Sequence, residues 1–238
     1  MYKVFSIVVT ILVLAAAAFG IVRKSSYTDI TADDSYLEEC MVGEFPESIA
    51  ALSSENMRQN LGNFPYILRV TPVGGLENDF HISQQKVTVK EVFKGDDISE
   101  GDEFYLYYKS WFVGVNPNDD PSPYISRGYV NILQEGKDYL VFLTERIEQY
   151  RSATPVYKVA DGGDFLIYAP VFCYEDMENI VSDNFYIKHS VPSTFVPYRE
   201  VKGNEIFAAS EGARQIMENL KKEMINRYPA GSGKDRAS

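Results

Sequence analysis

Aromatic side chains gather in one short stretch of the chain, and their type and spacing suit a binding surface. Six of the nine residues in the range 104–112 are aromatic. In an extended strand Tyr105 and Tyr107 share one face. Together with Trp111 they could form a platform for a sugar ring or a peptide. The alternative is that these rings pack as ordinary strand aromatics, half-buried or in the core.

The familiar patterns of enzymatic catalysis are missing from the sequence. It contains no G-x-S-x-G, no H-E-x-x-H and no C-x-x-C. Either of its two histidines, His81 and His189, could act as a general base. However, His189 and Ser190 are neighbours, and neighbours along a strand point to opposite faces. We therefore expect no catalytic residue of a known kind and no cofactor.

Carboxylates offer the remaining chemistry. An enzyme with an unrecognised carboxylate site, built from Asp119, Asp120 or Glu135, stays open as the alternative to a binding protein. Asn116 and Asn118 add oxygen atoms of the kind that calcium uses as ligands. The loop lacks the spacing of an EF-hand and is interrupted by a proline. We expect a solvated loop and no bound metal.

The chain has only two cysteines, Cys40 and Cys173. Two thiols cannot build a structural zinc site by themselves, and the histidines are not spaced to help them. Outside the cell the two cysteines could pair as a disulfide. Two separate buried thiols are the other possibility, because the sequence contains no information on the distance between them.

Short alternating segments between glycine turns predict the strands that would carry these residues. Val87 and Val89 fall on one face, and the alternation slips at Glu91, which indicates a bulge or the end of the strand. Residues 139–143 form an unbroken apolar run, typical of a strand buried on both faces. Three prolines in residues 114–128 argue against a central strand there. We predict a mainly β (α+β) fold, with a small antiparallel OB-like barrel or sandwich over residues 65–200.

Helices are expected on either side of this β-rich region. Residues 47–61 show weak helical spacing within a stretch, 23–64, that otherwise reads as an acidic tether. Apolar residues recur at helical spacing from Ala213 to Met224, so an amphipathic helix over 203–228 should pack on the barrel. Residues 229–238 are expected to be a disordered tail.

The N-terminal segment has the character of a membrane anchor or a signal peptide. Residues 4–22 are uncharged and rich in Val, Ile, Leu and Ala. As a helix they would reach about 28 Å, close to the hydrocarbon thickness of a bilayer. We expect a single-pass transmembrane anchor with the following domain outside the cytoplasm. Ala16 and Ala18 have the spacing of a signal-peptidase site, so secretion after cleavage near Ala18 is the alternative.

The charge of the exported part limits its partners. Once Lys3, Arg23 and Lys24 are set aside, 20 basic residues face 34 acidic ones, a net charge of −14. This argues against nucleic acid and anionic membrane surfaces as partners, because both require a cationic surface. We expect the membrane as a partner of the N-terminal helix, and an envelope protein or glycan as a partner of the domain.

Two sequence segments carry a resemblance to known proteins. They are Val-Lys-Glu-Val-Phe-Lys-Gly-Asp at residues 89–96 and Leu-Gln-Glu-Gly-Lys-Asp-Tyr-Leu-Val-Phe-Leu at 133–143, followed by a hairpin like that at 163–165. With these segments the chain resembles a loose group of uncharacterised exported or membrane-anchored proteins of Gram-positive bacteria. The resemblance spans about residues 65–168 and implies an OB-like barrel. It implies no catalytic residue.

Overall fold

The computed structural model describes most of the chain after residue 33. The described ranges are 34–79, 82–108, 111–114, 123–148, 153–161, 166–168, 170–187 and 194–231, with the isolated positions 10, 13 and 16 before them. The chain divides into two units, Met1–Asp34 and Ser35–Ser238. Thr10, Val13 and Ala16 in the first unit are helical. The second unit holds all the sheets described below.

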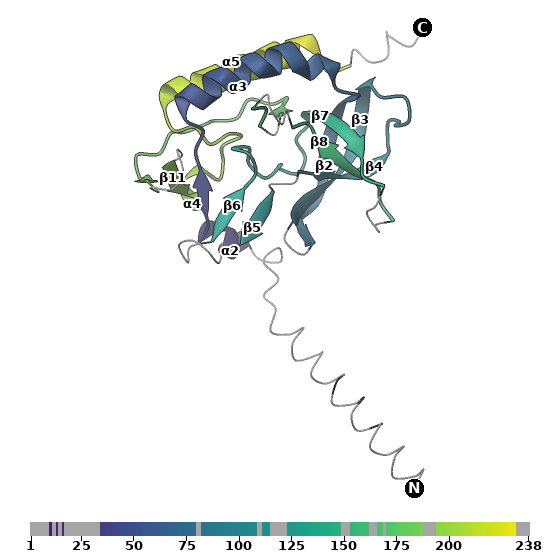
Figure 1. Ribbon diagram of the computed structural model, residues 1–238, viewed down its shortest axis with the longest axis horizontal. Helices are drawn as coiled ribbons and strands as arrows, with labels where there is room; N and C mark the ends of the chain where they lie inside the picture. The colour runs from purple at the N-terminus through teal and green to yellow at the C-terminus, as the bar shows by residue number, and fades with distance from the viewer. Residues whose placement is uncertain are drawn as a thin grey trace. The chain divides into compact units, whose positions relative to one another are not determined.

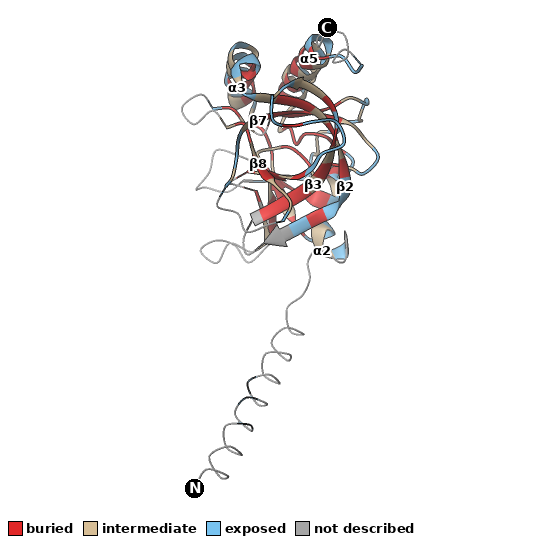
Figure 2. Cartoon of the chain, turned by 90° about the vertical axis from the view of Figure 1, so that its right-hand side faces the viewer, coloured by how far each residue is buried: buried red, intermediate tan, exposed pale blue. Residues whose placement is uncertain are grey.

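Five strands of the second unit close into a barrel in the order β2-β3-β4-β8-β7, because β7 pairs back onto β2. They are β2 (Tyr66–Asp79), β3 (Ile82–Lys94), β4 (Glu103–Tyr107), β7 (Tyr139–Arg146) and β8 (Val156–Val159). In Figure 2 these strands curve into a ring, and much of it is buried. The predicted barrel is therefore confirmed. One pair, β4 with β8, is parallel, and the other four pairs of the barrel are antiparallel.

The barrel interior is filled by the residues whose alternation predicted the strands. Val87, Val89, Phe104 and Leu106 are all buried in it. The predicted slip in β3 is a bulge: Arg69 pairs with Glu91 and the next residue pairs with Val89, so one residue of β3 is skipped. The strand then continues to Lys94, beyond the irregularity.

A layer of two helices covers one side of the barrel. Helices α3 (Glu47–Asn60) and α5 (Glu211–Arg227) lie side by side (Figure 1), and the 3-10 turn η1 (Leu61–Asn63) follows α3. The predicted C-terminal helix is confirmed. Its first turn is capped by Ser210, whose hydroxyl accepts a hydrogen bond from the backbone N–H of Ala213. Leu140 and Phe142 of β7 point outward into this layer, so β7 is buried on both faces as predicted.

A second sheet was missed by the sequence analysis. Its order is β10-β11-β1-β6-β5, and its strands are β1 (Met41–Gly43), β5 (Phe112–Gly114), β6 (Tyr124–Ser126), β10 (Tyr186–Ile187) and β11 (Thr194–Pro197). Helices α2 (Asp34–Glu38) and α4 (Tyr198–Val201) adjoin it in sequence, while β9 (Val171–Cys173) pairs with β7 in the barrel sheet. Strand β1 lies in the predicted tether, and β6 in the predicted proline loop. Both corrections have one cause: a strand of three residues is too short to show alternation.

Several predictions fall outside the described residues. These concern the carboxylates and amides at 116–120, the histidines His81 and His189, the hairpin at 163–165 and the tail from residue 232. Most of the predicted anchor, residues 4–22, lies outside them too. Within the residues that the structure does describe, no helix has the length and apolar character that crossing a membrane requires.

Candidate functional site

The predicted aromatic platform is only partly present. Tyr105 and Tyr107 point outward from β4 and are half-buried, as their alternation with Leu106 requires. Trp111 is fully buried in the barrel core cluster and cannot contribute to an exposed platform. This corrects the sequence prediction. The strand ends at Tyr107, so the alternation that fixes the two tyrosines does not extend to Trp111.

Charged side chains surround the two tyrosines on the outer face of β3, β4 and β8. Tyr105 pairs across the strands with Lys86, whose Nζ lies 2.5 Å from a carboxylate oxygen of Glu103. Tyr107 pairs with Lys158 on the other side. The Tyr105 hydroxyl donates a 3.1 Å hydrogen bond to Glu77 Oε1. Burial and this hydrogen bond raise the pKa of Tyr105. The face therefore combines two aromatic rings with fixed hydrogen-bonding groups.

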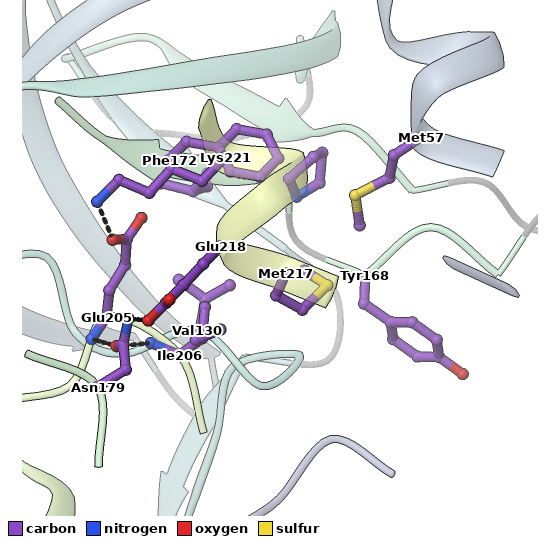
Figure 3. A pocket seen from close by; sticks show the side chains of 12 residues that line it. Met57, Val130, Tyr168, Phe172, Asn179, Glu205, Ile206, Met217, Glu218 and Lys221 are labelled. Carbon is purple, nitrogen blue, oxygen red and sulfur yellow. Dashed lines mark hydrogen bonds and ion pairs between the residues drawn. The ribbon is translucent and has the colours of Figure 1, made fainter. Parts of the chain in front are cut away.

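A narrow pocket lies between α5 and the barrel (Figure 3). Its lining is apolar on the side of Met57, Phe172 and Met217 and polar on the other side. Its empty volume, counted out to open solvent, is about 330 Å³. Most of that space lies at the mouth, and the interior has room for roughly one water molecule. It is too small, as it stands, to hold a substrate.

The polar side of this pocket is occupied by a buried ion pair. Lys221 Nζ lies 2.6 Å from Glu205 Oε2, and only 3% of the Glu205 side chain is exposed. The other oxygen of Glu205 accepts a 2.7 Å hydrogen bond from the backbone N–H of Cys173. Burial raises the pKa of Glu205, and Lys221 opposes that rise. Both carboxylate oxygens are engaged within the fold, so the pair fastens α5 to β9.

The two cysteines do not form the disulfide that the sequence allowed. Both are buried free thiols. Cys40 lies in the core of the second sheet and Cys173 in the barrel core, in separate clusters. Burial raises the pKa of each thiol to about 12. Because only the thiolate is a nucleophile, neither side chain is prepared for covalent catalysis.

A polar centre that sequence reasoning missed surrounds Arg127, immediately after β6. Its guanidinium is buried and stacks on Trp111, with Cζ 3.7 Å from the ring centroid. Its Nη2 donates a 2.9 Å hydrogen bond to Gln85 Oε1. No local pattern marks Arg127, because its burial depends on Gln85 of β3 and on Trp111, just before β5. The single tryptophan of the chain was the one available signal.

The described residues contain no cluster of three or more His, Cys, Asp or Glu side chains placed to bind a metal ion. Glu135, the one described member of the alternative carboxylate site, is exposed in the turn before β7. Neither a scan against protein-family models nor a search of curated proteins found a match to this chain.

Proposed function

We propose that this protein is a non-enzymatic binding module at the cell envelope, and that it holds a glycan against Tyr105 and Tyr107. One observation carries the proposal. The helices cover the barrel on the side of β2, β7 and β9, whereas the outer face of β3 and β4 keeps two half-buried tyrosines. A tyrosine ring offers an apolar face and a polar tip, which together suit a sugar.

The strand order of the barrel also supports the outer face of β3 and β4 as the binding surface. We propose that the barrel is OB-like, since it has five strands in a non-sequential order, with β4 and β8 closing it in parallel. OB-folds bind oligosaccharides and oligonucleotides on the face of their second and third strands. Here those strands are β3 and β4. The net charge of −14 after Lys24 argues against oligonucleotides and leaves the oligosaccharide.

The proposal includes a location outside the cytoplasm. The uncharged run at residues 4–22 supports a membrane anchor that places the binding module outside the cytoplasm, next to envelope polymers. Protease added to intact cells should then degrade the domain. Protection of residues 65–200 would contradict this orientation.

Binding of the purified full-length chain to isolated envelope polysaccharide tests the function. Tyr107→Ala should weaken binding by about ten-fold or more, as truncation of an interface hot spot does. The matched control is Tyr186→Ala, because Tyr186 is a 57% exposed tyrosine on β10 in the other sheet. Equal binding by the two variants would refute the tyrosine face. Cleavage of the polysaccharide would instead favour the alternative, an enzyme with a carboxylate site.

A further inference from the structure

Arg127 is the most deeply buried cation among the described residues. Only 2% of it is exposed. Of its donors, Nη2 reaches Gln85, while Nε and Nη1 have no hydrogen-bond partner among the residues that the structure describes. Leaving a donor of a charged group buried and unpaired costs more than losing an ordinary hydrogen bond. A folded chain that keeps such a group calls for a partner outside the described residues.

The positive charge of Arg127 also requires a partner. Among the described residues, the groups that act electrostatically on Arg127 are the phenols of Tyr198 and Tyr139, and no carboxylate is among them. Gln85 is neutral, and its Oε1 also accepts the backbone N–H of Leu133 at 2.8 Å. The net effect of burial is to lower the pKa of Arg127 to about 9. A buried ion without a counter-ion is strongly unfavourable, so the partner should be negatively charged.

A further donor belongs to Trp111, and a third lies on Ser83, which is hydrogen-bonded to the Trp111 backbone. Trp111, on whose ring it stacks, has a buried indole N–H with no partner in the described part of the chain. The hydroxyl of Ser83 is likewise buried and unpartnered, and the backbone of Ser83 donates a 3.0 Å hydrogen bond to the carbonyl of Trp111. Donors that lack acceptors thus come from Arg127, Trp111 and Ser83. A group that satisfies the N–H donors of Arg127 and Trp111 must supply acceptors, as an anion does.

The backbone at Arg127 is held in an uncommon conformation. The next two residues, Gly128 and Tyr129, both have positive φ values, 63° and 67°. This costs little at glycine but is unfavourable at tyrosine. The Tyr129 ring is fixed by edge-on packing on Phe45, with centroids 4.4 Å apart. The turn therefore holds Arg127 in place, and the guanidinium is preorganised for a ligand.

We propose that Arg127, with the donors of Trp111 and Ser83, forms a binding site for a small oxyanion, with a carboxylate as the best fit. A guanidinium matches the two oxygens of a carboxylate, and a single negative charge balances its own. A buried water molecule could satisfy an N–H but would leave the charge uncompensated. This site is separate from the tyrosine face and does not depend on the function proposed for it.

Two matched probes test the proposal on the full-length chain: acetate, and acetamide as its neutral analogue. Acetate at about one hundred times its Kd should raise the Tm by about 5–10 °C. It should also change the fluorescence of Trp111, the only tryptophan in the chain. Acetamide should do neither. Equal responses to the two compounds, or no response to acetate, would overturn the proposal without the use of any variant.

Variants locate the site. Arg127→Gln should abolish the response to acetate, and Arg127→Lys, which keeps the charge but loses the planar fork, should weaken it. Arg199→Gln is the matched control, because Arg199 is an exposed arginine on α4. General salt effects act alike on the unmodified chain and on its variants. The test is therefore the difference between their responses to acetate. An unchanged acetate response in a folded Arg127→Gln protein would place the anion elsewhere and refute the assignment.

Discussion

Lys221 on α5 and Glu205, in the segment before that helix, form an ion pair inside the protein, with Nζ and Oε2 2.6 Å apart. Lys221 also donates a 2.8 Å hydrogen bond to the carbonyl of Glu175. Glu205 in turn accepts from the backbone of Cys173 on the barrel. The pair therefore connects the helical layer, the β9 segment and the chain leading into α5.

Breaking this pair from one side should be costly. Lys221→Met leaves the Glu205 carboxylate buried without its cation, and we expect a loss of about 3–5 kcal/mol in the free energy of unfolding. Urea denaturation measures it. The double variant with Glu205→Gln should recover much of that loss. Arg227→Met, which breaks an exposed α5 pair with Glu223, should cost under about 1 kcal/mol. Equal losses in both single variants would contradict this account.

The stability of the Lys221→Met variant should depend on pH. Without Lys221, the hydrogen bond from the backbone N–H of Cys173 is left to oppose the burial that raises the pKa of Glu205. A carboxyl whose pKa is higher in the folded state stabilises the fold below its unfolded pKa, and this contribution is lost as the pH rises through the folded pKa. Lys221→Met should therefore regain stability when the pH is lowered from 7 towards 5. A stability difference from the unmodified chain that stays constant over this range would refute the assignment.

The cysteines should behave as two protected thiols. In the folded protein, burial raises the pKa of Cys40 and Cys173 to about 12, so neither should react with a thiol reagent at pH 8. Both thiols should react once guanidinium unfolds the chain, with no reductant present. A disulfide would give no reactive thiol under those conditions, and a mixed population would give fewer than two per chain.

Alkaline pH should unfold the protein cooperatively. Burial also raises the pKa of Tyr108 to about 12, from 10, while both thiols rise from 9. Acids with raised folded pKa values stabilise the fold at neutral pH, and this contribution disappears as the pH rises from about 9 through 12. The lowered pKa of Arg127 has the opposite effect on the pH dependence of stability. It is one group against the three acids with raised pKa values. Tyrosinate absorbance should rise together with the loss of circular dichroism; a gradual rise in the folded state would count against this.

Two glycines in neighbouring turns give a matched pair. A Cβ on Gly95, where φ is 135°, would lie 2.8 Å from Cδ1 of Tyr66 and 3.1 Å from Cγ2 of Ile98. Gly101 has φ of 89° and nothing within 4 Å. Gly101→Ala should cost about 1 kcal/mol through its backbone alone, and Gly95→Ala about 2–4 kcal/mol because packing strain adds to it. Equal values from chemical denaturation would contradict the close approach to Tyr66.

The elements that could be predicted were those with a repeating pattern. Val87 and Val89 showed the period of two that fills a barrel interior, and Ala213 to Met224 showed the period of a helix packed on one side. Each pattern persisted long enough to identify the buried face. Residues 139–143 are apolar throughout because one set faces the barrel and the other faces α3 and α5.

The missed features depend on contacts that no local pattern records. Strands β1 and β6 are three residues each, and they pair with one another although more than eighty residues separate Met41 from Tyr124. Arg127 and Trp111 illustrate the same limit for the candidate sites. An arginine in an acidic chain normally faces water, and its burial here follows from the meeting of the barrel with the second sheet.

The pairing of α3 with α5 has a consequence for how the protein is made. Arg58 and Glu223 form a 2.8 Å ion pair between these helices across 165 positions of sequence. The ribosome synthesises α3 early and α5 late, so the apolar surfaces of α3 and β7 have no cover until nearly the whole domain has emerged. The helical layer that covers β7 can therefore be completed only after α5 has been synthesised.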